Sequence, residues 1–490
     1  MHVCRRWRQV VFASPLYLDL RILCTARTPV GENLSFWPAL PIAIDFGYNS
    51  NAWHGNNAYM HNIMTALEHV DRVCDISLHA TGSELEKITT VMQEPFPMLT
   101  GLAIRSLDGN APVLPAEFLG GSAPHLQFIH MLGIPFPTLP ALLLSTGDLV
   151  YLTLFNIPPS DYISPEAFVV GLAALPRLKI FLIGFQSATP SPDRMHPPPV
   201  TRTILPALTY FGFKGASEYL EDLVSRIDAP QLDEIHISYL NQLVNFQVNQ
   251  LARFVNRTVG PKLSQSMYAQ VNFCRDRVTF DMSRHANNDR YPNHAITGIV
   301  CQGVDWQVSH LAQVLSHVSA TLSTVPHLEL KTYLYGRQLE GTDDVEWLHL
   351  LHQFSTVRTL QVSRELAGHV ALALEDLASE AVAQTLPSLD LIYLAGQPAS
   401  SIESFLAARQ LSGLPVTVVE TQTEFNEKLK SHVRKYENIT HQLRRLLFFV
   451  RHSNVSDHRP SQLSGYFVHG GRTCIFCCLH ILYGLHCHDT

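Results

Sequence analysis

The residues best suited to bind a metal ion lie near the C-terminal end of the 490-residue chain. Thiolates with nearby imidazoles are the usual ligands of structural zinc. The candidates are Cys474, Cys477, Cys478 and Cys487. Known zinc sites separate their two ligand pairs by about a dozen residues or more, whereas the short interval here is mainly apolar. We therefore predict no metal site, and a zinc centre at these cysteines is the alternative.

A second group with possible chemistry combines acidic residues with histidines. Asp343, Asp344 and Glu346 precede His349 and His352, and such a set can bind a metal or transfer protons. Acidic residues that open a helix are more simply explained by the helix dipole. The sequence contains no nucleophile elbow, phosphate-binding loop or His-Glu-x-x-His motif. It therefore predicts no cofactor and no enzymatic activity.

A repeated phrase defines the elements that fill most of the chain. Apolar residues spaced Leu-x-x-Leu-x-Leu follow a proline at six places, Pro97, Pro124, Pro176, Pro206, Pro230 and Pro387. Between residues 73 and 232, successive copies begin roughly 23 to 30 residues apart, close to the period of leucine-rich repeats. The phrase alternates like a strand with one buried face, and its proline suits a residue that enters a strand without donating to the ladder.

Helical spacing separates the copies of the phrase. One example is the set Tyr219, Leu220, Leu223, Val224 and Ile227. A strand and its return helix bury their apolar faces only when neighbouring repeats stack. The sequence thus predicts an α/β, leucine-rich-repeat-like solenoid of short parallel strands and return helices over residues 25–437. The alternative is a doubly wound α/β domain, but its strands would be continuous apolar runs.

Composition restricts the partners and the compartment. The chain has 42 acidic and 35 basic residues and a formal net charge of -7, which argues against a nucleic-acid partner. No apolar run of ~20 residues could span a membrane, and the first residues do not form a secretory signal. Five cysteines scattered singly are typical of reduced thiols. We expect an intracellular protein, in the cytoplasm or the nucleus.

The first 24 residues carry a short amphipathic pattern. Cys4, Trp7 and Val11 fall on one face of a helix, and Ser14-Pro15 ends that helix before Leu16. From the residues alone, this is an amphipathic helix with an apolar tail. Such a helix would cap the end of the solenoid.

The same segment resembles a known module. The string V-C-R-R-W-R, followed by A-S-P-L-Y-L-D-L, resembles the second half of an F-box. With residues 37–42 and the repeats, the chain is similar to fungal F-box proteins with leucine-rich-repeat-like C-terminal regions. The resemblance implies a partial all-α F-box over residues 1–24, without the opening Leu-Pro-x-Glu helix. Its docking helices or core would contain Val3, Cys4, Trp7, Val11 and Leu16.

The resemblance also implies a function. In that family the F-box docks on a Skp-type adaptor of a cullin-RING ubiquitin ligase, and the repeats capture the protein to be ubiquitylated. We therefore expect a substrate-receptor subunit of an SCF-type ligase. The alternatives are a solenoid scaffold without ligase docking, a truncated remnant and, in a different class, an α/β enzyme. Residues 438–490 change abruptly in composition, which predicts a disordered tail.

Overall fold

The computed structural model describes most of the chain between residues 21 and 421. The described ranges are 21–25, 31, 34, 40–46, 57–159, 162–187, 201–240, 249–258, 268–274, 277–283, 295–302, 307–317, 322–332, 344–375, 385–395 and 398–421. Within them, one 16-stranded sheet runs the length of the molecule. None of the helices in these ranges combines the length and apolar character needed to cross a membrane.

The N-terminal part of the sheet is parallel and follows the chain order. Each strand pairs with the next, as expected when every repeat contributes one strand. Its strands are β1 (Ile22–Thr25), β2 (Ile42–Phe46), β3 (Val73–Ala80), β4 (Gly101–Ser106), β5 (Phe128–Leu132), β6 (Tyr151–Ile157), β7 (Ile180–Phe185), β9 (Tyr210–Gly215) and β11 (Glu234–Leu240).

The strand order is reversed once, in the middle of the sheet. Beyond β11 the order is β14, β13, β12 and then β15, and β13 is antiparallel to both of its neighbours. The C-terminal strands are β12 (Tyr268–Phe273), β13 (Arg277–Ser283), β14 (Ala295–Gln302), β15 (His327–Thr332), β16 (Thr359–Val362), β17 (Leu391–Ala395) and β18 (Thr417–Thr421). The expectation of parallel strands throughout is therefore wrong for β13, because a short connection between β12 and β13 forces an antiparallel hairpin.

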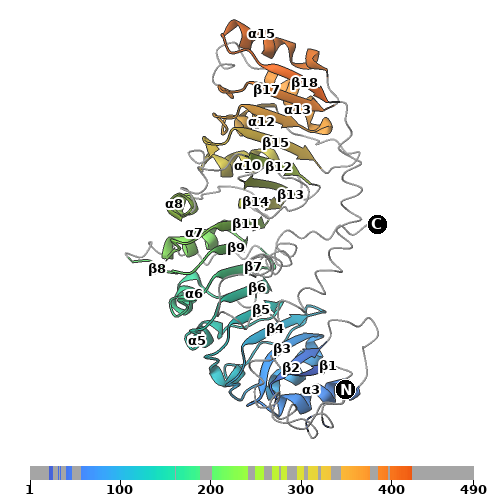
Figure 1. Ribbon diagram of the computed structural model, residues 1–490, viewed down its shortest axis with the longest axis vertical. Helices are drawn as coiled ribbons and strands as arrows, with labels where there is room; N and C mark the ends of the chain where they lie inside the picture. The colour runs from blue at the N-terminus through green and yellow to red at the C-terminus, as the bar shows by residue number, and fades with distance from the viewer. Residues whose placement is uncertain are drawn as a thin grey trace, which may run out of the picture.

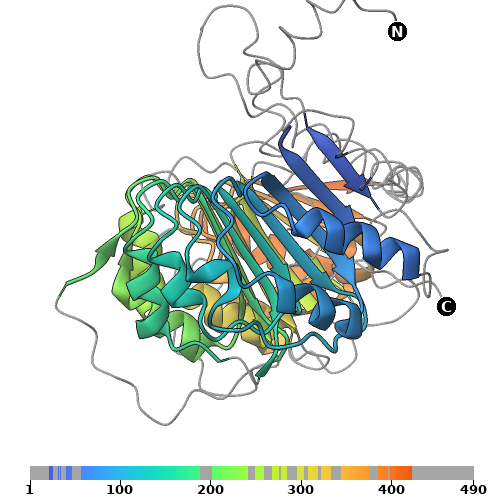
Figure 2. The ribbon, with the colours of Figure 1, turned by 90° about the horizontal axis from the view of Figure 1, so that it is seen from below.

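The helices of the described residues cover one face of the sheet (Figures 1 and 2). Figure 1 shows an arc with the helices on its convex side and the strands on its concave side. The helices are α3 (Asn57–Leu67), α4 (Gly82–Val91), η1 (Phe118–Gly121), α5 (Leu139–Leu143), α6 (Pro165–Leu172), α7 (Ser217–Arg226), α8 (Asn249–Thr258), α10 (Gln307–Ser316), α12 (Asp344–Leu351), α13 (Arg364–Glu375), η3 (Ala399–Ile402) and α15 (Glu403–Leu411). The predicted leucine-rich-repeat-like solenoid is confirmed for the described residues.

The prolines of the repeated phrase lie in a turn, one step earlier than expected. The amide of Leu99 donates to the carbonyl of Phe96 at 3.2 Å, so Pro97 is the second residue of the turn and β4 begins only at Gly101. The same bond joins Leu126 to Ala123 around Pro124. A fixed φ suits proline to the second position of such turns. The phrase therefore encodes a turn followed by a strand.

The main core lies between the sheet and the helices. Alternate strand residues, such as Phe181 in β7 and Phe211 in β9, are fully buried there. Their rings continue from repeat to repeat, since the centroids of Phe168 and Phe181, and of Phe181 and Phe211, are 5.5 Å apart, and those of Phe211 and Phe254 6.1 Å apart. Such contacts add to the burial of apolar area. They explain why adjacent repeats stay in register.

Charged groups join α7 to α8 at both ends, just before the strand order reverses. The buried carboxylate of Glu221 accepts the amides of Gln250 and Leu251 in the first turn of α8, at 2.7 and 2.8 Å. Both amides would otherwise lack a partner in the helix. Burial raises the pKa of Glu221, and the two amide bonds oppose that rise. A carboxylate at this position also complements the helix dipole.

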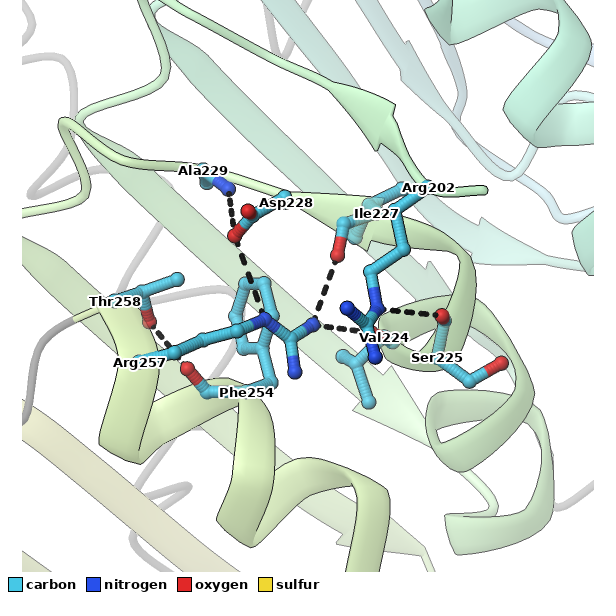
Figure 3. A network of polar contacts seen from close by, with 9 residues as sticks. All are labelled: Arg202, Val224, Ser225, Ile227, Asp228, Ala229, Phe254, Arg257 and Thr258. Atoms are coloured by element: carbon cyan, nitrogen blue, oxygen red, sulfur yellow. Dashed lines mark hydrogen bonds and ion pairs between the residues drawn. The ribbon is translucent and has the colours of Figure 1, made fainter. Parts of the chain in front are cut away.

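At the opposite ends of the two helices, Arg257 makes the second contact of what we call the joint between α7 and α8 (Figure 3). The guanidinium of Arg257, at the end of α8, donates to the carbonyls of Val224 and Ile227 at 3.1 and 3.0 Å and lies 3.4 Å from the carboxylate of Asp228. These carbonyls end α7, where a cation is favoured. Nearby, β8 (Thr203–Ile204) pairs with β10 (Ile227–Asp228). The joint therefore fixes α8 beside α7.

Candidate interaction surface

The concave face is formed by the strand residues that alternate with the core positions. Residues paired across parallel strands point to the same face, so the strand register defines rows of side chains across the arc. One row runs from Phe128 through Tyr151 and Ile180 to Tyr210. A neighbouring row begins at His130 and passes through Leu182 to His236. These rows line the inside of the arc, and Phe128, His130 and Tyr151 are their half-buried members.

The centre of the concave face carries an apolar patch on β5, β6, β7 and β9. It is a cluster separate from the main core and consists of Leu132, Tyr151, Phe155, Ile180, Leu182 and Tyr210. All are buried except the half-buried Tyr151. A glycine makes room for one ring, because a Cβ atom on Gly184 would lie 2.6 Å from the ring of Phe155. The half-buried rings of Phe128 and Tyr151, 6.1 Å apart, form its edge.

Next to this patch lies a polar patch, which we define as His236, Ser238, Gln270, Asn272, Thr279 and Asp281. These residues lie on β11, β12 and β13, where the strand order reverses. The ring of His236 stacks on Tyr210 at 5.2 Å, and burial lowers the pKa of His236 to about 3. The imidazole is therefore neutral at physiological pH. It joins the apolar patch to the polar patch.

Amide side chains of the polar patch bond to one another. The side-chain amide of Gln270 donates to Asn272 at 2.6 Å, and that of Asn272 donates to the hydroxyl of Thr279 at 3.0 Å. The hydroxyl of Ser238, which is buried, makes no hydrogen bond within the described part of the chain. A buried polar group without a partner costs free energy. The polar patch thus contains one buried hydroxyl, that of Ser238, without a hydrogen bond to a described residue.

Asp281 is the one acidic member of the polar patch. It lies on β13 between Gly298 of β14 and Gln270 of β12. Its carboxylate is half-buried, and burial raises its pKa to about 7. No described residue donates a hydrogen bond to it or pairs with it. The alternation of apolar and polar residues in R-V-T-F-D-M-S is sufficient to place Asp281 opposite the core, but no catalytic or metal-binding motif of the sequence includes it.

The C-terminal strands continue the concave face with paired groups. Tyr268 and His327 stack with their centroids 4.8 Å apart. The ammonium of Lys331 lies 2.8 Å from the carboxylate of Glu329. On β17, Tyr393 is half-buried. This part of the concave face therefore combines aromatic and charged side chains. Its aromatic residues are Tyr268 on β12 and Tyr393 on β17.

Of the acidic and histidine group of the sequence, Asp343 lies outside the described residues and the other members lie on or just after α12, on the convex side. Helix α12 begins at Asp344 and includes Glu346 and His349, which agrees with the dipole explanation. The Nε2 atom of His352 lies 3.2 Å from the hydroxyl of Thr385. Over the described ranges, no group of three or more His, Cys, Asp or Glu residues could hold a metal ion.

The other predicted site residues fall outside the described ranges. They are the F-box candidates Val3, Cys4, Trp7, Val11 and Leu16 and the metal candidates Cys474, Cys477, Cys478 and Cys487. Their proposed roles remain predictions from the sequence.

The architecture defines the class as a leucine-rich-repeat-like solenoid. No protein-family profile and no curated protein sequence matches the chain. Among solved structures, it is similar to the leucine-rich repeat-containing protein LegL7 from Legionella pneumophila, with 12% identity and a TM-score of 0.27 over 76% of this chain and 98% of that one. It is also similar to TLR13 in a complex with ssRNA13, with 12% identity and a TM-score of 0.28 over 78% of this chain and 48% of that one. Similarities this weak carry no information about partners.

Proposed function

We propose that the solenoid is a protein-interaction domain that holds a target protein against its concave face. The supporting observation is the set of half-buried aromatic rings along that face, at Phe128, Tyr151, Tyr268 and Tyr393. Aromatic side chains dominate the binding energy of many protein interfaces because they bury a large area with little loss of side-chain entropy. No catalytic role is assigned to any residue.

We further propose that the chain is a substrate receptor of an SCF-type cullin-RING ubiquitin ligase, acting inside the cell. The support is the N-terminal resemblance to the second half of an F-box. In this proposal Val3, Cys4, Trp7, Val11 and Leu16 form the docking helices or the F-box core, and a Skp-type adaptor is the partner. The solenoid then holds the target near the charged ubiquitin. A scaffold without ligase docking is the alternative.

Co-purification with a Skp-type adaptor tests the ligase proposal. The full chain is expected to retain the adaptor in stoichiometric amounts. Trp7→Ala should abolish retention, because in this proposal the indole belongs to the docking helices or the F-box core. The matched control is Tyr393→Ala, which changes an aromatic side chain on the distant concave face and should leave retention unchanged. Failure of the unsubstituted chain to retain the adaptor would contradict the ligase role and favour the scaffold.

A further inference from the structure

No described residue donates a hydrogen bond to the half-buried carboxylate of Asp281 or forms an ion pair with it. Of its two cross-strand neighbours, Gly298 has no side chain, and the side-chain amide of Gln270 donates to Asn272. The amide of Asn272 in turn donates to Thr279. The side-chain amides of Gln270 and Asn272 therefore donate to other members of the polar patch. Neither makes a described hydrogen bond to Asp281.

The described basic side chains nearest to Asp281 are paired with another carboxylate, far from Asp281 or uncharged. Lys331 pairs with Glu329 at 2.8 Å. Arg277 is on the same strand as Asp281, four residues away, which corresponds to about 13 Å along a strand. His236, two strands away and so at roughly 10 Å, is neutral because burial holds its pKa near 3. Within the described ranges, no cation therefore pairs with this carboxylate.

We propose that Asp281 is the binding site for a cationic side chain, Lys or Arg, of the protein held in the concave face. Because Gly298, the cross-strand neighbour of Asp281 on β14, has no side chain, we place the ammonium or guanidinium group beside the carboxylate on that side. A charge-assisted bond in a partly desolvated site is stronger than one in water. This inference rests on the proposed interaction function and adds the chemistry of the partner.

Labelled hexapeptide pools provide a test with a defined probe. Each pool is random except at one position, which is fixed as Lys, Arg, norleucine or Glu, and binding to the full chain is measured by fluorescence anisotropy at pH 8. The Lys and Arg pools should bind about tenfold more tightly than the norleucine pool. In Asp281→Asn, which keeps the size of the side chain, this preference should disappear.

The matched control is Glu329→Gln, which removes a carboxylate that already has a partner in Lys331. It should retain the preference, whereas a general attraction to the net negative charge would weaken equally in both variants. Pools that bind without cation preference, or a preference that survives in Asp281→Asn, would overturn this inference and leave the interaction function standing. Absence of binding by every pool would overturn both.

Discussion

Asp281 is the residue whose surroundings differ most from those of an ordinary surface carboxylate. It is half-buried on the concave face, faces the backbone of Gly298 on one side and receives no hydrogen bond from the described residues. Such a group destabilises the isolated molecule when it is ionised, because burial removes part of its hydration. Residues of this kind are common at functional sites. Its effect on stability can be measured without knowing the partner.

Removal of the charge at Asp281 should change the pH dependence of stability. Burial raises the folded-state pKa of Asp281 from its ordinary value of 3.8 to about 7, so the native state holds more protons than the unfolded state between these values, and stability falls as pH rises through this window. At pH 8, Asp281→Asn should be more stable than the unsubstituted protein by about 1 kcal/mol, since the half-buried carboxylate keeps part of its hydration.

Urea unfolding at pH 4 and pH 8 measures this difference. At pH 4 the two proteins should be nearly equal in stability, because the carboxyl is protonated in the native state. The neighbouring titratable groups Glu234, Glu329, His236 and His327 are present in both proteins and cancel in the comparison. An equal difference at the two pH values would show that Asp281 has an ordinary pKa.

Among the elements, the pairing of α7 with α8 shows how a single charged side chain can fix the position of a helix. The carboxylate of Glu221 satisfies two amides at the start of α8, and the guanidinium of Arg257 satisfies carbonyls at the end of α7. Each charge has the sign that the adjacent helix end favours. This joint lies immediately before the reversed strands, so it supports the part of the sheet that carries the polar patch.

Loss of the Glu221 carboxylate should loosen α8. Glu221→Ala leaves two amides of the first turn without partners, and we expect a loss of about 2 kcal/mol in the free energy of unfolding. The amides of Gln250 and Leu251 should also exchange with solvent faster, which hydrogen exchange measures directly. Glu86→Ala, in the exposed face of α4, is the control and should change stability by less than about 0.5 kcal/mol. Equal effects of the two substitutions would contradict the proposed joint.

The sequence predicted those elements whose signal is local. The repeated phrase correctly predicted β4, β5, β7, β9, β11 and β17, since an apolar alternation after a turn is sufficient to define a strand. It did not predict that β13 is antiparallel, because V-T-F-D-M alternates in the same way for either strand direction. Direction depends on the connection and the pairing partner, which are not local properties. The arrangement of the polar patch was not predicted for the same reason, since the reversal places β14 between β11 and β13 and thereby decides which residues face one another across the strands.

For the whole molecule, the decisive property is that one continuous sheet forms the inside of the arc (Figure 1). A surface of this shape can contact a partner over many repeats at once, and the affinity then depends on a few anchor residues. Most of the apolar patch is buried, so the half-buried rings at its edge and the half-buried residues Gln270, Thr279 and Asp281 of the polar patch are the groups that remain for a partner. The central claim is therefore that binding occurs on the concave face.

Site-specific photo-crosslinking in cells tests this claim most directly. A photoreactive amino acid is placed at the concave positions Tyr151 and Tyr393 and, for comparison, at the exposed convex positions Val170 and Leu372, which are 56% and 55% exposed. We predict that both concave positions give the same discrete crosslinked protein and that neither convex position does. A discrete adduct from the convex positions, with none from the concave ones, would contradict the claim.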